Sequence, residues 1–403
     1  MKELPFKGKK VLIIVENLPV PFDRRVWMEA LTLKKYGATV SVISPKGKKK
    51  YLEKEIVIDG INVFRYKPYE AKEGFFPFFW EFFYCWWMTF FLTWKVFFKV
   101  GFDVIHACNP PETFFLIGIF FKVFGKKFIF DHHDLSPELY LAKMGKKKGD
   151  IFYKALILLE KLTFKTADVV ITTNNSHREI AIKRGGVEED RIFIVRSGPD
   201  TKRFKIHEPS KKLKQGKRFM VCYLGEMCKQ DGVELLIDAA YLIENKFERD
   251  DVLFVMIGGG PEQPNMVKYA KEKGIKNMFF TGRISDDELS KYLSSCDLCV
   301  DPDPKNDWSD RSTMNKIMEY MYFGKPIVAF DLKENSFSAK DAALYARENS
   351  VEDFAKLIVR LLDDGALREK MGKFGRERFE NFLSWEHSVP NLVDAYKKVF
   401  NLK

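Results

Sequence analysis

Around residue 315 the sequence places groups that could bind a nucleotide diphosphate. Ser312 and Thr313 are typical N-cap residues ahead of a helical pattern, and free amides with the helix dipole favour an anion there. Lys316 and Glu319 are three residues apart and would share a helix face. The ammonium group of Lys316 could bind a diphosphate. The carboxylate of Glu319, one turn further along the helix, could accept hydrogen bonds from the vicinal hydroxyls of a ribose. A capped surface helix with an ordinary ion pair explains these residues equally well.

A second polar group follows a short apolar run in the first half of the chain. Asp131-His132-His133-Asp134 comes directly after Phe128–Phe130, where a parallel strand would end and where open α/β sheets bind ligands. A neutral imidazole can hold a hydroxyl, and a neighbouring carboxylate can set its tautomer or take a proton. One of two adjacent histidines is usually structural, so we expect one of this pair to serve packing.

The elements that must position these groups follow an alternating pattern. In both halves of the 403-residue chain, short apolar runs alternate with segments of helical period, which is typical of doubly wound parallel sheets. The expected strands are Val11–Val15, Thr39–Ile43, Ile56–Ile58, Val63–Arg65, Val104–Ala107, Phe128–Phe130, Val169–Thr172, Met220–Leu224, Leu253–Ile257, Met278–Phe280, Leu298–Val300 and Ile327–Phe330. Asp23–Tyr36 should form an amphipathic helix, and Asp59-Gly60 a hairpin turn. The pattern predicts an α/β fold with two Rossmann-like domains.

Composition divides the chain into four parts. Between Gly198 and Arg218 the apolar period is lost and proline, glycine and lysine accumulate, which predicts a linker. We therefore expect an N-terminal domain at 1–200, a linker at 201–217 and a C-terminal domain at 218–384. The remaining residues 385–403 form an amphipathic pattern without a strand behind it. That helix should either cap the second sheet or cross back to the first domain.

Positive charge is concentrated in the first half. Residues 1–200 hold 33 Lys and Arg against 23 Asp and Glu, whereas residues 201–403 hold 34 against 33. Lysine clusters at 46–50, 126–127 and 146–148 suit an anionic membrane surface, and a solvated basic face is the alternative.

The segment Gly74–Trp94 carries one charge, Glu81, and is otherwise mostly aromatic or aliphatic. A spanning helix needs about 20 apolar residues, and the uninterrupted run Phe82–Trp94 is shorter. Its tryptophans favour the level of lipid headgroups, and Lys95 and Lys99 could reach phosphates, so we expect interfacial insertion. A fully buried helix and a transmembrane span are the alternatives.

The N-terminus and the cysteines favour a cytoplasmic location. The first ten residues lack the apolar stretch of a signal peptide. All six cysteines lie in or beside apolar runs, as buried free thiols do. Cys296 and Cys299 form a lone C-x-x-C without the second pair or the histidines of a zinc site, so we expect them in the core.

Several motifs together resemble GT-B glycosyltransferases, and in particular glycosyltransferase family 4. The motifs are Gly258-Gly259-Gly260-Pro261-Glu262, Thr281-Gly282-Arg283-Ile284, and Lys316–Met321 followed by Gly324-Lys325-Pro326-Ile327-Val328. The resemblance covers nearly the whole chain. It implies two Rossmann-like domains facing each other across a cleft, with a nucleotide-diphosphate sugar on the second domain and the acceptor on the first. It also implies retention of anomeric configuration and no cofactor besides the sugar donor.

The resemblance assigns roles to individual residues. Glu319 matches the second glutamate of the family's E-x7-E motif and would bind the donor ribose, while His133 with Asp134 matches the histidine near the transferred sugar. The residues expected at the donor are Ser312, Thr313, Asn315, Lys316, Glu319, Arg283, Ile284, Gly259, Gly260, Glu262, Arg196 and Lys229. Those expected at the acceptor are Glu16, Asn17, Arg24, Arg25, Asn109 and, beside packing, His132.

Two positions depart from the family pattern. Arg311, beside Asp310, stands where the first glutamate of E-x7-E is usual. Residues 225–232 lack the arginine and lysine that commonly hold the diphosphate. A leaving diphosphate needs preorganised donors, and the candidates to replace the clamp are Arg311, Lys316, Arg196, Lys229 and the amides near Thr313. Of these, Arg311 is expected, with His133 and Asp134, to take part in catalysis.

We therefore expect a retaining glycosyltransferase that transfers a sugar to a lipid-linked or growing glycan acceptor, peripheral or monotopic on the inner face of the plasma membrane. It would need no metal, since the helix terminus and cations would take the place of one and the D-x-D pattern Asp301-Pro302-Asp303 is expected to be a loop. A catalytically inactive scaffold subunit would explain the missing clamp, and a nucleotide-sugar epimerase shares the two-sheet layout. Nucleic-acid binding would fit the pI of about 9.1, but the ring-rich segment is nearly uncharged, whereas such proteins interleave basic residues with exposed rings.

Overall fold

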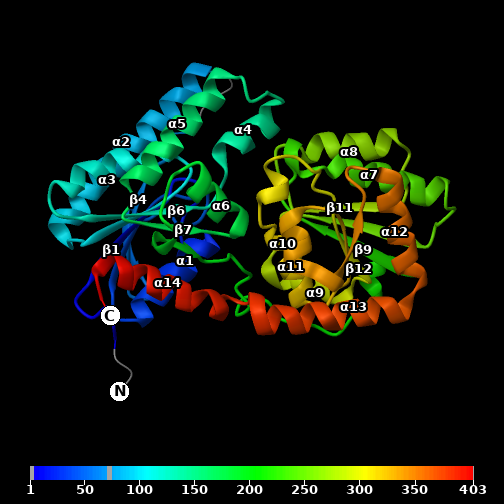
Figure 1. Cartoon of the computed structure of the whole chain (residues 1–403). Coiled ribbons are helices and arrows are strands. Elements are labelled where there is room, and N and C mark those ends of the chain that lie inside the picture. Colours follow the sequence, from blue (N-terminus) through cyan, green and yellow to red (C-terminus); the bar gives the residue numbers. More distant parts are fainter. Residues whose placement is uncertain (1–3, 70–74, 403) are drawn as a thin grey trace. The chain divides into compact units, whose positions relative to one another are not determined.

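The computed structural model describes residues 4–69 and 75–402 and consists of two α/β units, each built on its own sheet (Figure 1). The first unit contains the chain up to Leu141, Lys146–Ser197 and the C-terminal segment from Ser388. The second contains Gly198–His387 together with Ala142–Gly145. The expected class of two Rossmann-like, mainly parallel sheets is confirmed.

The sheet of the first unit has eight strands in the order β3-β4-β2-β1-β5-β6-β7-β8. Their bounds are Lys10–Ile14 (β1), Thr39–Pro45 (β2), Glu55–Ile58 (β3), Ile61–Tyr66 (β4), Val104–Cys108 (β5), Lys127–His132 (β6), Val169–Thr172 (β7) and Ile192–Ile194 (β8). All neighbours are parallel except β3 and β4, which are joined through Asp59 and Gly60 in left-handed conformation, as the sequence predicts. The sequence pattern does not predict β8.

Helices cover both faces of this sheet. Their bounds are Arg24–Lys35 (α1), Phe75–Lys99 (α2), Phe115–Lys122 (α3), Ser136–Met144 (α4), Ile151–Thr166 (α5), Asn175–Lys183 (α6) and Trp385–Phe400 (α14). The predicted helix near Asp23 is confirmed, and it begins at Arg24 because the Asp23 side chain accepts a hydrogen bond from the amide of Val26. Helices α1 and α14 lie on one face, and α2, α3 and α5 lie on the other (Figure 1).

Helix α2 has an inverted distribution of side-chain size. Its buried positions are mostly small, namely Cys85, Thr89, Thr93 and Val96, which lie on one face against the sheet. Six of its described rings are exposed, namely Trp80, Phe82, Phe83, Trp87, Phe91 and Phe98, whereas Tyr84, Trp86, Phe90, Trp94 and Phe97 are half-buried against the core. The alternative of a fully buried helix is therefore wrong. Among the described residues, no helix combines the length and the apolarity that crossing a membrane requires.

The sheet of the second unit has six parallel strands in the order β11-β10-β9-β12-β13-β14. They are Phe219–Leu224 (β9), Val252–Ile257 (β10), Met278–Gly282 (β11), Leu298–Asp301 (β12), Ile327–Phe330 (β13) and Ala343–Ala346 (β14). The helices are Val233–Asn245 (α7), Gln263–Glu272 (α8), Asp286–Ser295 (α9), Asn315–Tyr322 (α10), Lys333–Ala339 (α11), Val351–Asp363 (α12) and Gly365–Arg378 (α13). All five strands expected in this half are present, and only β14 is not predicted.

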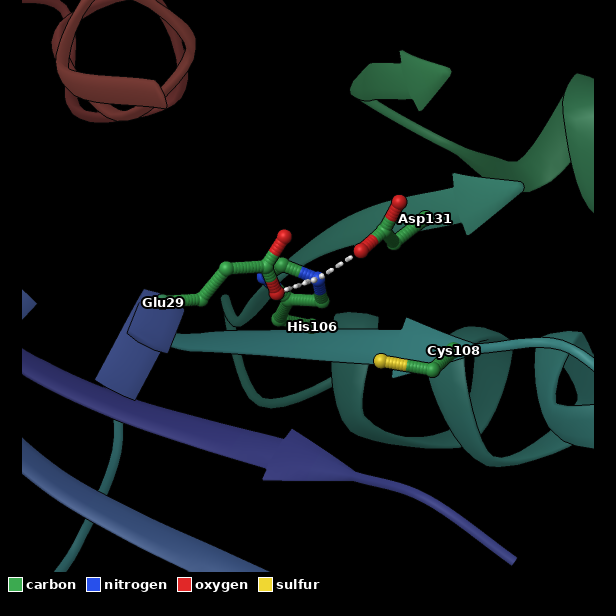
Figure 2. A group of neighbouring side chains, drawn as sticks. All are labelled: Glu29, His106, Cys108 and Asp131. Carbon is green, nitrogen blue, oxygen red and sulfur yellow. Dashed lines mark hydrogen bonds and ion pairs between the residues drawn. The ribbon is translucent and has the colours of Figure 1, made fainter. Parts of the chain in front are cut away.

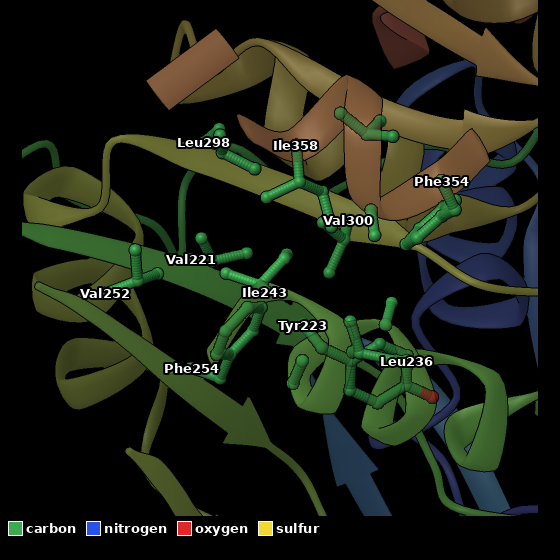
Figure 3. Close-up of a cluster of buried hydrophobic side chains, with 14 of the residues drawn as sticks. Val221, Tyr223, Leu236, Ile243, Val252, Phe254, Leu298, Val300, Phe354 and Ile358 are labelled. Carbon is green, nitrogen blue, oxygen red and sulfur yellow. The ribbon is translucent and has the colours of Figure 1, made fainter. Parts of the chain in front are cut away.

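One apolar core lies on each face of this sheet. On one face, Val221 and Phe254 of the strands pack against Ile243 of α7 and Ile358 of α12 (Figure 3). On the other face, α9 and α10 cover a core that contains Cys222, Cys296 and Cys299. All six cysteines are free thiols and five are buried, so the expectation of core thiols holds for the C-x-x-C pair.

The segment expected as a linker is attached to the second unit. Phe204 is buried in the core beneath α9 and α10. The amides of His207 and Ser210 donate hydrogen bonds to the hydroxyls of Ser294 and Ser295 at the end of α9.

Replacing the buried ring of Phe254 should destabilise the second unit. Phe254→Ala is expected to lower the free energy of unfolding by about 3–5 kcal/mol, because the ring is 1% exposed and its removal leaves a cavity. The matched control is Phe279→Ala on the neighbouring strand β11, which is 38% exposed and should cost less than about 1 kcal/mol. Urea denaturation followed by circular dichroism measures both. Equal costs would contradict the core described above.

Candidate functional site

The carboxyl ends of β5 and β6 bring together the polar residues of the first unit. The two strands pair in parallel, with Cys108 opposite Asp131. Residues alternate between the faces of a strand, so Asp131 points toward α1 and α14, whereas His132 points toward α5. This alternation gives the two adjacent histidines, His132 and His133, different surroundings.

Asp131 is the centre of a buried network. Its Oδ1 lies 2.8 Å from Arg25 Nη2, and its Oδ2 lies 3.1 Å from His106 Nε2 and 2.6 Å from His133 Nε2. Arg25 also contacts Glu29 at 3.2 Å, one helical turn further along α1. Figure 2 shows the imidazole of His106 between the carboxylates of Glu29 and Asp131.

The charges in this network are set by burial and by Arg25. Burial disfavours ionisation of Asp131, but Arg25 and His133 outweigh it and hold the pKa of that carboxyl well below its usual range. Burial, with the nearby charge of Asp131, raises the pKa of Glu29 well above its usual range. Burial also lowers the pKa of His106. At neutral pH we therefore describe Asp131 as ionised, and Glu29 and His106 as neutral.

The four side chains drawn in Figure 2, Glu29, His106, Cys108 and Asp131, are of types that bind transition metals, and their ligand atoms lie within 4.8 Å of one another. The guanidinium of Arg25 already supplies the positive charge there, through its contacts with both carboxylates. Burial raises the pKa of the Cys108 thiol well above its usual range, so the thiolate that metals require is disfavoured. These donors therefore form a buried hydrogen-bond network around Arg25 and fit a metal poorly.

Asn109 holds the loop that carries His133. Its Oδ1 accepts hydrogen bonds from the amides of His133 and Asp134 at 2.6 and 3.2 Å, and its Nδ2 donates to Glu112 and to the carbonyl of Asp134. Burial raises the pKa of Glu112 to about 7. The predicted acceptor residue Asn109 thus uses its amide group to fix the backbone of 133–134.

His132 is part of the core between the sheet and α5. Its imidazole is fully buried, packs edge-on against Phe164, and lies 3.2 Å from Glu160. Burial, together with the charge of Arg184, lowers its pKa to about 3. Of its two expected roles, the structure therefore places His132 in packing.

The remaining acceptor candidates lie at the carboxyl edge near β1. Glu16 follows β1, and burial with the charge of Glu81 raises its pKa to about 8. Asn17 is exposed, and Arg24 is half-buried at the first residue of α1. This edge of the sheet therefore carries a neutral carboxyl group, that of Glu16, beside the exposed side chain of Asn17.

In the second unit, Lys316 is bound by two buried carboxylates. Its Nζ lies 3.1 Å from Asp301 Oδ1 and 3.0 Å from Asp303 Oδ1, above the ring of Tyr223. Burial opposes the charge of Lys316, but the two aspartates raise its pKa well above the usual range. The D-x-D pattern Asp301-Pro302-Asp303, which the sequence suggests is only a loop, therefore supplies both ion-pair partners of Lys316. The feature of the sequence that could have indicated this role is the position of the pattern directly after an apolar strand.

The start of α10 differs from the expectation. Met314 occupies the N-cap position without a side-chain hydrogen bond, and the hydroxyl of Ser312 instead donates to the carbonyl of Trp308. The prediction that Ser312 or Thr313 caps this helix is therefore wrong, because the turn Ser309–Arg311 immediately before it takes up that hydroxyl. Helix α10 begins at Asn315, and Glu319 lies within it at 8% exposure.

The glycines after β10 differ in what they require. Gly258 and Gly260 have φ of +127° and +148°, and a Cβ at Gly260 would lie 2.5 Å from the carbonyl oxygen of Met227. Gly259 has no such constraint, and a Cβ there would meet only Gln263 Oε1 at 3.5 Å and the amide nitrogen of Arg283 at 3.8 Å. Backbone conformation thus requires glycine at positions 258 and 260. At position 259 a side chain would be tolerated in the free protein, because a Cβ there has room beside the backbone of Arg283.

Other donor candidates are placed as follows. Lys229 and Glu262 line the same cavity of about 560 Å³, together with Glu234 and Tyr269. Arg311 forms an ion pair with Asp307 at 3.6 Å. Ile284 packs against the core beneath α9 and α10. In the first unit Arg196 is buried, and its carbonyl accepts a hydrogen bond from Ser388.

Sequence reasoning missed three members of the first-unit network. They are Glu29, His106 and Tyr396, whose hydroxyl lies 2.7 Å from His106 Nδ1. The signal for Glu29 was a carboxylate four residues after Arg25, within the otherwise apolar face of a helix. Tyr396 gave no signal, because it lies 290 residues away from His106 along the chain.

Comparisons with known proteins agree with these two units. Residues 23–203 match the family model Glycosyltransferase Family 4, and residues 204–378 match the model Glycosyl transferases group 1. An uncharacterized glycosyltransferase of Methanocaldococcus jannaschii is 25% identical over 364 residues, which is 87% of each chain. A UDP-Gal:alpha-D-GlcNAc-diphosphoundecaprenol alpha-1,3-galactosyltransferase of Escherichia coli is 26% identical over 251 residues, or 59% of this chain and 62% of that protein.

A solved structure supports the fold over the whole length. The structure of HepE from Anabaena in complex with UDP and glucose superposes with a TM-score of 0.71, covers 96% of this chain and 99% of that chain, and is 15% identical. The expected family resemblance is confirmed in both halves. The chain is therefore a glycosyltransferase of the GT-B fold and belongs to the family 4-like members of that group.

Proposed function

We propose that this glycosyltransferase transfers a sugar, with retention of configuration, from a nucleotide diphosphate to a lipid-linked glycan acceptor at an anionic membrane surface. The observation that carries the membrane assignment is the exposure of six aromatic rings on α2. The name of the Escherichia coli relative supports the acceptor class, since it specifies a diphosphoundecaprenol-linked sugar. The UDP in the HepE structure supports the donor class.

The exposed rings of α2 continue over two neighbouring helices. Trp94 and Phe90 of α2 contact Phe120 of α3, and α3 packs beside α5. The exposed large apolar side chains of these helices, and of the residues that follow α3, form a surface that we call the apolar face. Its members are Trp80, Phe82, Phe83, Trp87, Phe91, Phe98, Leu116, Ile119, Phe120, Val123, Phe124, Ile151, Phe152, Leu158 and Leu162. Contiguous exposed apolar surface of this kind is typical of membrane or protein contact.

Lysines on α5 favour the membrane among these partners. Lys154, Lys161 and Lys165 are exposed on the same helix as the apolar residues Leu158 and Leu162. Interleaved lysines and apolar side chains on a helix suit an interface with anionic lipid. Lys95 and Lys99, which the sequence suggested for this role, instead form ion pairs with Glu55.

We assign the donor to the second unit and the acceptor to the first. Glu319, Gly259 and the backbone at Arg283 would contact the nucleotide, and the uncapped amides at the start of α10 would face the diphosphate. Lys316 would act through its ion pairs with Asp301 and Asp303 rather than as a free cation. In the first unit, His133 would accept a hydrogen bond from a hydroxyl of the substrate.

Retention constrains the chemistry. The bond from the anomeric carbon to the diphosphate breaks, and a bond to the acceptor oxygen forms on the same face of the sugar. The proton of the acceptor hydroxyl then passes to the departing phosphate oxygen. Charge stabilisation and positioning therefore matter more than a covalent nucleophile.

The central experiment measures transfer directly. Purified protein, incubated with vesicles that contain a bacterial lipid extract, should release a nucleoside diphosphate from one of a panel of nucleotide sugars, and only when a lipid-linked acceptor is present. Nucleotide binding without release from any donor would support the inactive scaffold instead. Conversion of a nucleotide sugar into its epimer, without an acceptor, would support an epimerase.

Substitutions at the donor site should weaken nucleotide binding without unfolding the second unit. Gly259→Ala should raise the Kd for the bound nucleoside diphosphate about 10-fold, because the added methyl group has room in the free protein but would meet the ligand. Glu319→Ala should have a similar effect through the lost ribose hydrogen bonds. Isothermal titration with UDP, GDP and ADP measures both.

The matched control for Gly259 is Gly149→Ala. Gly149 also lacks a positive φ and has open space around its Cβ position, but it lies in the first unit. Its Kd should stay at the wild-type value. An unchanged Kd in both Gly259→Ala and Glu319→Ala would remove these residues from the donor site.

Polar substitutions on the apolar face should weaken vesicle binding. The triple variant Phe98→Ser, Val123→Ser, Ile151→Ser is expected to lower co-sedimentation with phosphatidylglycerol-containing vesicles by at least about 10-fold, since each lost side chain removes apolar burial in the interface. Neutral phosphatidylcholine vesicles should bind the wild type more weakly, because the lysines of α5 then lack a partner.

A control of equal composition lies in the second unit. The variant Phe382→Ser, Val267→Ser, Ile206→Ser also replaces three exposed apolar side chains. It should sediment with vesicles as the wild type does. If the two triple variants behave alike, the apolar face is not the membrane contact.

A further inference from the structure

We propose that Glu16 binds a hydroxyl group of the acceptor sugar, at the place where the carboxyl edge of the first sheet meets the apolar face. The ligand class is an uncharged sugar joined to a lipid chain. This inference rests on the proposed function and deepens it, because it names the residue that recognises the acceptor. Glu16 is a binding residue in this arrangement and takes no part in breaking or forming the bonds of the sugar.

The register of the sheet places Glu16 on the face that α2 covers. Ile14 of β1 lies opposite Ile43 of β2, and the amide of Val15 continues this ladder with a hydrogen bond to the carbonyl of Ile43. Two residues further along, the same level is occupied by Glu16 and, across β2, by Tyr66 at the end of β4. Ile14 and Tyr66 belong to the core beneath α2, so Glu16 points to that side as well.

Helix α2 supplies the other neighbours of Glu16. Glu81, Cys85 and Thr89 follow one another at intervals of four residues and share one face of the helix, on which Cys85 and Thr89 are buried. Burial and the nearby charge of Glu16 raise the pKa of the Cys85 thiol to about 11. The titratable groups around Glu16 are thus Glu81 and Cys85 from α2 and Tyr66 from β4, whereas β2 contains none.

The carboxyl group of Glu16 is buried on one side only. Its Oε2 is buried and has no hydrogen-bond partner in the part of the chain that the structure describes. The side chain as a whole is half-buried, so Oε1 is the oxygen that a ligand can reach. Burial, together with the charge of Glu81, raises the pKa of Glu16 to about 8, and the group is therefore mostly protonated at neutral pH. A protonated carboxyl group can donate one hydrogen bond and accept another.

An uncharged ligand with hydroxyl groups fits these surroundings better than a charged one. The groups next to Glu16 are a phenol, a thiol and a second carboxyl group, and among the described residues no cation contributes to its pKa. A phosphate at this position would meet Glu81 without a counter-ion, and burial disfavours an uncompensated charge. A hydroxyl group pairs with the protonated carboxyl group without adding charge, since each can donate and accept.

The apolar face begins directly beside this carboxyl group. Trp80 and Phe82, which precede and follow Glu81 on α2, are exposed, and the ring of Trp80 lies 5.6 Å from that of Phe83. Because α2 leads into β5, which is parallel to β1, the first turns of α2 lie at the carboxyl edge of the sheet. A ligand with its sugar at Glu16 can therefore extend its lipid chain along the apolar face.

Two substitutions separate recognition of the acceptor from support of the fold. Glu16→Gln keeps a hydrogen-bonding group of the same size that cannot ionise, and Glu16→Ala removes the group. In the transfer assay with vesicles that contain the bacterial lipid extract, Glu16→Ala should raise the apparent KM for the extract about 10-fold. The KM for the nucleotide sugar should change less than about twofold, and Glu16→Gln should stay within about threefold of the wild type in both constants.

The pH dependence distinguishes this role from a structural one. Above a pKa of about 8 the wild-type carboxyl group ionises and can no longer donate a hydrogen bond. The apparent KM for the extract should then rise about 10-fold between about pH 7 and about pH 9, as the protonated fraction falls. Glu16→Gln should show no such rise. The matched control is Glu179→Gln on α6, a surface carboxylate paired with Lys183, which should keep the wild-type profile.

Thermal unfolding tests the carboxyl group without any measurement of activity. The pKa of Glu16 is raised in the folded protein from its usual value of 4.5 to about 8, so its contribution to stability is full below 4.5 and is lost as the pH rises to about 8. Glu16→Gln does not titrate. Its Tm relative to the wild type should therefore increase by at least about 2 °C between about pH 5 and about pH 8. A Tm difference that does not vary with pH would contradict the proposal.

Co-sedimentation separates the acceptor site from the transfer reaction. Vesicles that contain the lipid-linked sugar fraction of the extract should bind the wild type more tightly than the same vesicles without it, and Glu16→Ala should lose this difference. Retention of the difference in Glu16→Ala, or equal pH profiles of the wild type and Glu16→Gln, would overturn the proposal and leave only solvent as the partner of Glu16. Loss of the difference in a protein that transfers no sugar would leave the site standing and refute the proposed function instead.

Discussion

The ion pair between Arg25 and Asp131 is the interaction on which the polar cluster at the carboxyl edge of the first sheet depends. Removing either charge would leave the other buried without its main charged partner, which is strongly destabilising. The pair lets Asp131 remain ionised at a position with no solvent contact. An ionised Asp131 in turn orders His106 and His133, and through them Tyr396 of the C-terminal helix.

The second unit uses the same principle with different residues. Lys316, at the start of α10, is neutralised by Asp301 and Asp303 at the carboxyl end of β12. Both units therefore place a buried cation against carboxylates where parallel strands end, which is the edge where α/β sheets bind ligands. The consequence for the donor site is that Lys316 is not a free point charge. A bound diphosphate would depend more on backbone amides and on other cations.

Helix α2 carries the exposed rings on which the proposed membrane contact of the first unit rests. Ordinary surface helices bury their large apolar residues and expose small or polar ones. In α2 the fully buried residues are mostly small, so the helix packs closely against the sheet while six of its rings remain exposed. This arrangement would be costly in water, and contact with a lipid interface removes that cost because the rings no longer meet solvent.

The sequence by itself determined the fold class, twelve of the fourteen strands and the motif positions, because alternation of apolar runs and glycine-containing turns are local signals. It also placed Glu319 within a helix and His133 at the end of a strand. Only the tertiary structure decided which side chains meet: Asp131 with Arg25, His106 with Tyr396, and Lys316 with Asp301 and Asp303. The hydroxyl of Ser312 likewise went to a preceding turn instead of the helix it was expected to cap. Which side chains pair depends on contacts between residues far apart in the chain, and which residue caps a helix depends on competition between neighbouring turns. Neither produces a periodic pattern in the sequence.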